Sequence, residues 1–259
     1  MTHRLIFALV LVFSGLTEGK GQFFYYGQEP SSLQWKTFDT PHFTIYYTED
    51  ASLQAHYFSR LLEKNYRYFS TKENLFPQQT PVVIHNRDIV SNGFSVPAPL
   101  RMEISTLPSQ DLTALKSLPL LAIHEFRHSM QIAAFRNGFA RHLNWLLGDV
   151  AVSGAMARLP FWFIEGEAVY SETAYTYAGR GRDGDFLMEW QALADSDGNI
   201  SYDKAIQGSF KDFIPNYYKL GYQIYNHGQR YYPDSLWRYT LHRTAHVPYG
   251  FRPFSKALR

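Results

Sequence analysis

The chain of 259 residues contains no cysteine. This absence excludes disulfide bonds, cysteine-ligated zinc, iron–sulfur clusters and thiol nucleophiles, so any metal has to bind His, Asp or Glu side chains. The chain also lacks a large excess of either charge, because 25 Lys plus Arg stand against 23 Asp plus Glu. The basic residues form no run. The sequence therefore shows no electrostatic footprint for nucleic acid, and we expect no such partner.

Long hydrophobic runs are missing as well. After the N-terminal region, no segment has the eighteen uninterrupted apolar residues that indicate a membrane-spanning helix, so we expect no stable membrane span in the mature chain. Apolar residues nevertheless make up 45% of the chain, and aromatic residues alone 17%. This composition and the chain length predict one large globular domain or two small ones with a real core.

The N-terminus has the order of regions found in a secretory signal peptide. Met1–Arg4 carries positive charge, Leu5–Phe13 is apolar, and Ser14–Gly21 supplies small and polar residues. We predict a signal peptide over residues 1–21, with cleavage before Gln22. An uncleaved membrane anchor or a buried first helix is the alternative. An exported chain without cysteine fits a bacterial periplasmic or secreted protein.

The region after the signal peptide, residues 22–116, is expected to contain the strands. Aromatic and β-branched runs predict strands at 43–47 and 81–85, with an amphipathic helix over 51–70 between them. The segment 94–106 contains Pro97 and Pro99, which predict an edge strand or extended chain in its first half. We therefore expect a small mixed sheet in the N-terminal half.

Residues 117–259 are expected to be mainly helical, which gives an α+β fold with a metal-binding helix between the two halves. Ser117 and Gly138 are suitable capping residues for a helix over 118–137. The segment 139–160 reads as a loop with one short helix. Further helices are predicted over 161–177, 185–194, 217–231 and 235–243.

The predicted helix over 118–137 contains His124-Glu125-Phe126-Arg127-His128, the H-E-x-x-H pattern. Residues four apart lie on one helix face, so His124 and His128 can bind one metal, while Glu125 can take a proton from a metal-bound water. With 10 His in the chain, chance would give this pattern only about 0.02 times. The alternative is a helix with two histidines and a glutamate that bind no metal.

A second motif follows downstream, with its Glu165 standing 37 residues after His128. The order H-E-x-x-H and then W-x-x-E-G-x-A-x-Y, from Trp162 to Tyr170, resembles the gluzincin metallopeptidases, especially the peptidase MA-like domain of bacterial exported proteins. The resemblance covers about Trp35 to Tyr231, although only the two motifs are specific. It implies a zincin-like fold over 22–259, a Zn²⁺ cofactor, a peptide or protein substrate, and Glu165 as third zinc ligand.

Glu167 is the competing candidate for the third ligand. The family more often has an apolar residue at that position, so this chain has a second carboxylate within the motif. Helical spacing favours Glu165, since it shares a face with Glu172, whereas Glu167 lies about 200° around the helix. Glu172 would then accept a hydrogen bond from a ligand imidazole, or it is a plain surface carboxylate.

Weaker candidates concern substrate binding. Tyr218, Tyr222 and His227 lie on one predicted helix and could donate to an oxyanion, although ordinary packing is the simpler explanation. The extended stretch that ends at Arg101–Ser105 could be the edge strand that receives a peptide substrate. Asp195–Asn199 reads as a turn, because Ile206 stands where a calcium loop needs a bidentate Glu.

The sequence therefore predicts a zinc metallopeptidase with His124, His128 and Glu165 on the metal and Glu125 as general base. The alternative function is a non-catalytic zinc-binding interaction module of a larger exported protein. The last residues, Pro253–Arg259, read as the start of a helix, so we expect further domains of a longer chain, and similar domains often precede β-propeller repeats.

Overall fold

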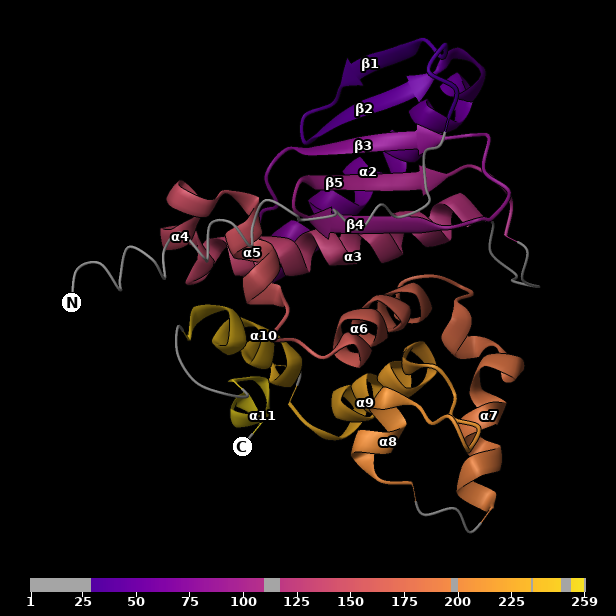
Figure 1. The fold of residues 1–259 in the computed structure, drawn as a ribbon, viewed down its shortest axis with the longest axis vertical. Coiled ribbons are helices and arrows are strands. Elements are labelled where there is room, and N and C mark those ends of the chain that lie inside the picture. The colour runs from indigo at the N-terminus through magenta and orange to yellow at the C-terminus, as the bar shows by residue number, and fades with distance from the viewer. Residues whose placement is uncertain (1–28, 110–116, 197–199, 234, 248–252, 259) are drawn as a thin grey trace, which may run out of the picture. The chain divides into compact units, whose positions relative to one another are not determined.

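The structure is a computed structural model that describes residues 29–109, 117–196, 200–233, 235–247 and 253–258 (Figure 1). The chain divides into two units, residues 1–32 and 33–259, and the fold described below is that of the second. The predicted signal peptide and part of the Asp195–Asn199 turn lie outside the described residues. Among the described residues, no helix has both the length and the apolar character that crossing a bilayer requires.

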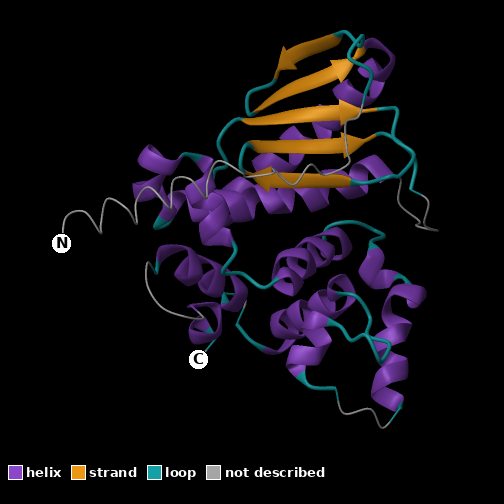
Figure 2. Ribbon diagram, viewed as in Figure 1, coloured by secondary structure: helices purple, strands orange, loops and turns teal. Residues whose placement is uncertain are grey.

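Five strands form one mixed sheet in the first half of the second unit (Figure 2). They are β1 (Trp35–Asp39), β2 (Phe43–Thr48), β3 (Thr80–His85), β4 (Gly93–Pro97) and β5 (Leu100–Ser105). Their order is β1-β2-β3-β5-β4, with β3 parallel to both β2 and β5 and antiparallel pairing at each end. The expected strands at 43–47 and 81–85 are confirmed, whereas β1 was not predicted.

One face of the sheet is apolar because every second residue of its central strands is large and hydrophobic. These fully or almost fully buried side chains are Phe43, Ile45, Val82, Ile84, Met102 and Ile104. They pack against α2 (Ser52–Glu73), which buries Phe58, Leu62 and Phe69 at helical spacing, and against α3 (Ser117–Asn137). Helix α2 ends at Glu73, three residues beyond the predicted end, and is capped by Asn74, whose φ of 51° is left-handed.

The helix α3 is buried on nearly all sides, because it lies between the sheet and the helices that follow. It packs on α2 and β4 on one side and on α6 (Phe161–Ala174) on the other (Figure 1). This position agrees with the predicted metal helix between the two halves. Because water is excluded around α3, every polar group on it needs a partner inside the protein.

A second core lies among the C-terminal helices, centred on Phe163, Tyr225 and Trp237. The remaining elements are α4 (Ala140–Leu147), α5 (Asp149–Met156), η2 (Arg180–Arg182), α7 (Gly184–Asp195), α8 (Tyr202–Gln207), α9 (Tyr217–Tyr231), α10 (Leu236–His246) and α11 (Pro253–Ala257). A short 3₁₀ turn, η1 (Glu49–Ala51), precedes α2. The helices predicted over 217–231 and 185–194 are confirmed to within a residue.

Two predictions are wrong. Residues 139–160 do not form a loop with one helix but two helices, α4 and α5, separated by Gly148 with a φ of 57°. The residues Arg101–Ser105 are not at the edge of the sheet, because β5 pairs with β3 and with β4. The hairpin between β4 and β5 places β4 outermost, which confirms the edge strand expected in the first half of 94–106.

Candidate metal centre

Two histidines on α3 bring their ring nitrogens together. His124 and His128 are both buried, and their Nε2 atoms lie 3.2 Å apart. The rings meet edge to face, with centroids 4.8 Å apart. This arrangement follows directly from the i, i+4 spacing, which places both side chains on one helix face.

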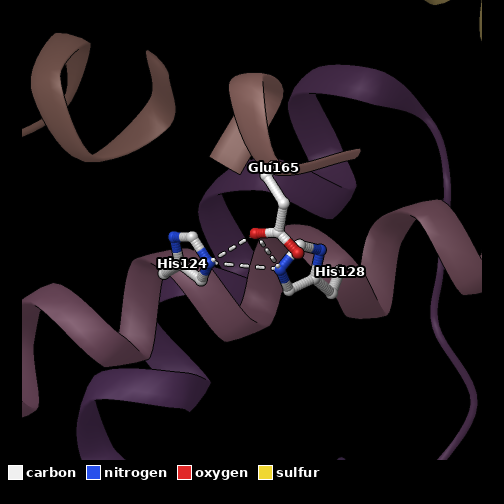
Figure 3. Close-up of side chains that lie close together, drawn as sticks. All are labelled: His124, His128 and Glu165. Atoms are coloured by element: carbon white, nitrogen blue, oxygen red, sulfur yellow. Dashed lines mark hydrogen bonds and ion pairs between the residues drawn. The ribbon is translucent and has the colours of Figure 1, made fainter. Parts of the chain in front are cut away.

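The third member of the group comes from α6. Glu165 Oε2 lies 3.2 Å from His124 Nε2 and 3.4 Å from His128 Nε2, so one carboxylate oxygen faces both imidazoles (Figure 3). One donor atom from each residue lies within 4.8 Å of the others. The structure thus brings together the three predicted metal ligands, and their close approach is of the size that one metal ion bridges.

The other nitrogen of each imidazole faces an acceptor. His124 Nδ1 lies 2.5 Å from Glu172 Oε1, and His128 Nδ1 lies 3.0 Å from Gln131 Oε1. A metal ion on the two Nε2 atoms would require the tautomer with a proton on each Nδ1, and Glu172 and Gln131 are placed to accept those protons in hydrogen bonds. The predicted contact between Glu172 and a candidate ligand imidazole is confirmed, and the donor set fits a divalent cation.

The pKa values of the group show that the Glu165 carboxylate favours positive charge on the two imidazoles. Burial alone would lower the pKa of His128, but the nearby Glu165 carboxylate outweighs it and raises that pKa to about 10. The pKa of His124 is likewise raised by Glu165 and Glu172 against its burial. In turn, the two imidazoles overcome burial and hold the pKa of Glu165 well below its usual range.

Glu125 stands beside this group without belonging to it. Its side chain is buried and accepts a hydrogen bond from Ser95 Oγ on the edge strand β4, with 2.9 Å between Oγ and Oε2. Burial raises the pKa of Glu125 above its ordinary value, although the imidazoles of His128 and His124 act against it. The carboxylate is therefore a stronger base than an exposed one.

Glu167 belongs to a neighbouring network, which Gln131 joins to His128. Its carboxylate accepts hydrogen bonds from Arg127 Nη2 at 2.9 Å, from Gln131 Nε2 at 2.7 Å and from Tyr225 Oη at 3.0 Å. Arg127 also forms an ion pair with Glu73 of α2. Because its acceptor capacity is directed to these partners, Glu167 is not in the metal group, and the structure places Glu165 there instead.

Of the three oxyanion candidates on α9, one lies beside the group. The Tyr218 ring stacks on His124 with 6.3 Å between centroids. Tyr222 instead reaches Gly181, with 3.3 Å from its hydroxyl to the carbonyl oxygen. His227 is exposed and contacts the ring of Tyr231.

Sequence reasoning missed three residues that contact the site. Arg180 forms an ion pair with Glu172 and lies over the Tyr218 ring, 5.3 Å from its centroid. Ser95 binds Glu125, and Gln131 binds His128. Only Gln131 had a signal in the sequence, because it stands three residues after His128 on the same helix face.

A comparison of the chain with protein-family models and with curated protein sequences finds no match. The site is therefore interpreted from its own geometry. Two imidazoles and a carboxylate can hold one divalent cation, and a buried carboxylate beside them can accept and return a proton.

Proposed function

We propose that this protein is a zinc-dependent metallopeptidase of the gluzincin type. The observation that supports this most is the convergence of His124, His128 and Glu165, with the basic carboxylate of Glu125 next to them and outside the group. Two imidazoles and one carboxylate without any thiolate suit zinc in an open, catalytic site. The resemblance of the two sequence motifs to the peptidase MA-like domain supports the same assignment.

In this proposal His124, His128 and Glu165 hold the zinc, with Glu172 and Gln131 fixing the two imidazoles. When bound, zinc supplies a Lewis acid that polarises the scissile carbonyl and lowers the pKa of water. Glu125 receives the proton of the attacking water and then gives it to the leaving amine. Ser95 orients the Glu125 carboxylate for both transfers through its hydrogen bond.

Tyr218 is the proposed donor to the oxyanion. Burial, and then the negative charge of Glu165, raise the pKa of its hydroxyl far above the usual range, so it stays protonated and can donate. The Arg180 guanidinium lies over the Tyr218 ring and also forms an ion pair with Glu172. The substrate is proposed to be a peptide or protein that meets the protein after export, in keeping with the predicted signal peptide.

Zinc analysis tests the site first. Purified protein is expected to contain one zinc per chain by elemental analysis, and Glu165→Ala is expected to lose it. Glu172→Gln, which removes the negative charge that faces both His124 and Arg180, is expected to weaken zinc binding by about 10–100-fold. Glu189→Ala is the control, because Glu189 on α7 pairs with Lys219 on α9 and is not a member of the metal group. A wild type that stays metal-free after zinc addition would favour the non-catalytic module.

Zinc binding is also expected to release protons. In the metal-free protein, Glu165 raises the pKa of His128 to about 10, so this imidazole carries a proton at pH 8. Zinc binds the neutral imidazole, and at least one proton per zinc should therefore leave at pH 8. An ordinary histidine, with a pKa of about 6.5, would release almost none. Calorimetry in buffers of different ionisation enthalpy measures this number, and a value near zero contradicts the His128 assignment.

A further inference from the structure

Large apolar side chains are exposed along α4 and in the first turn of α5, on both sides of Gly148. They lie within eight consecutive residues, and their exposed fractions are Leu143 40%, Trp145 91%, Leu146 71%, Leu147 51% and Val150 65%. In Figure 1 these two helices follow the C-terminal end of α3 at one side of the sheet. We call these five residues the α4–α5 apolar patch.

The patch is held in place by buried side chains of α4 and α5 and by the hydrogen bonds of Asp149. Its own apolar side chains contribute little to this attachment. Helix α4 buries only Ala140, and α5 buries Ala151, Val152 and Met156. Asp149, at the start of α5, accepts hydrogen bonds from Arg136 Nη1 at 2.7 Å and from the Leu100 backbone N–H at 3.1 Å. The turn is thus fastened to α3 and to the β4–β5 hairpin while its apolar side chains face outward.

This exposure runs against the sequence pattern of α4. Leu143, Leu146 and Leu147 stand at i, i+3 and i+4, the spacing of a helix face that normally packs on a core. Within the described part of the chain that face is not covered, although each leucine left in water forgoes the favourable transfer of its apolar surface. An apolar face that is built but left open indicates a binding surface.

The chemistry around the patch favours a lipid surface over a protein partner. Arg141 and His142 are exposed on the same helix, and Asp149, the one acidic residue between Asn137 and Ile164, is already paired with Arg136. Tryptophan and leucine beside an exposed arginine such as Arg141 are typical of a segment that lies in a membrane interface.

We propose that the α4–α5 apolar patch docks on the surface of a lipid bilayer that contains anionic headgroups. Trp145 and Leu146 enter the interfacial region, and Arg141 contacts lipid phosphates. The segment lies on the membrane and does not cross it. The contact is independent of the proposed zinc chemistry, since none of these residues belongs to the metal group.

Cosedimentation of the full-length chain with vesicles tests the proposal. The probes are vesicles of phosphatidylcholine and phosphatidylglycerol at 7:3 and vesicles of phosphatidylcholine alone. The double variant Trp145→Ser/Leu146→Ser is expected to lower the partition coefficient on the mixed vesicles at least about 10-fold. Arg141→Gln is expected to lower it about fivefold on mixed vesicles and to leave it unchanged on phosphatidylcholine.

The matched control removes two exposed apolar side chains elsewhere. Leu53→Ser/Phe210→Ser substitutes side chains that are as exposed as Trp145 and Leu146 but lie outside the patch, and it should partition like the wild type. Every variant keeps the apolar run Leu5–Phe13, so its contribution cancels. The far-ultraviolet circular dichroism spectrum and urea unfolding check that each variant is folded.

Quenching by brominated lipid gives a second, site-specific measurement. The difference in fluorescence between the wild type and Trp145→Phe gives the emission of Trp145. We expect brominated phosphatidylcholine in the mixed vesicles to quench this emission. Equal partition of the patch and control variants, together with unquenched Trp145 emission, overturns the proposal. A dimer that becomes monomeric only in the patch variant, with partition unchanged, also overturns it and assigns the patch to a second copy of the chain.

Discussion

Glu125→Gln is expected to lose hydrolysis and to keep its zinc. In the proposed mechanism Glu125 moves a proton twice, from the attacking water and to the leaving amine. Glutamine has nearly the same shape and can still accept the Ser95 hydrogen bond, but it cannot carry the proton. A positioned general acid–base group contributes about 10²–10⁴-fold, so we expect kcat/KM to fall about 10³-fold.

The measurement combines cleavage of a fluorescence-quenched peptide library with zinc analysis of the same preparations. Glu125 is not one of the three grouped ligands, so the zinc content of Glu125→Gln should equal that of the wild type. Glu189→Gln on α7 serves as the control and should keep both properties. If Glu125→Gln cleaves peptides as fast as the wild type, Glu125 is not the base. If the wild type binds zinc and cleaves no peptide, the result favours the alternative function, a non-catalytic zinc-binding interaction module.

The metal group could be predicted because its main determinant is local. The spacing of His124 and His128 places both on one face of any helix, and the sequence around them contains no helix breaker. The seven-residue spacing of Glu165 and Glu172 predicted a shared face in the same way. The structure shows the consequence, because these two carboxylates contact opposite nitrogens of His124.

The contacts that the sequence did not reveal all depend on how distant elements meet. Arg180 reaches Glu172 only because Gly179, with a φ of 139°, turns the chain back toward α6. Ser95 meets Glu125 because the sheet places β4 beside α3. The helices α4 and α5 were missed because residues 139–160 are punctuated by glycines, and Gly148 proved to separate two helices rather than to mark a loop.

The contact between α6 and α9 leads to the second large expected effect. The two helices touch backbone to backbone at Gly166 and Gly221. A Cβ on Gly221 would lie 1.9 Å from the Trp162 carbonyl oxygen, and one on Gly166 would lie 2.3 Å from the Gly221 carbonyl carbon. Glycine inside a helix costs about 0.8–1.0 kcal/mol relative to alanine, so its presence at both positions is explained by the close approach.

Gly221→Ala is expected to lower the free energy of unfolding by about 3 kcal/mol, because a backbone carbonyl cannot move aside as a side-chain end can. The matched control is Gly154→Ala in α5, where an added Cβ meets no atom within 4 Å and helix propensity should raise stability by about 0.5–1 kcal/mol. Urea unfolding of the metal-free proteins separates packing from zinc binding.

Since α6 carries Glu165 and α9 carries Tyr218, Gly221→Ala should also weaken zinc binding by displacing α6 from α9. A Gly221→Ala protein as stable as Gly154→Ala would show that the two helices do not meet at this glycine pair, and the placement of Glu165 against the histidines would then lose its structural support.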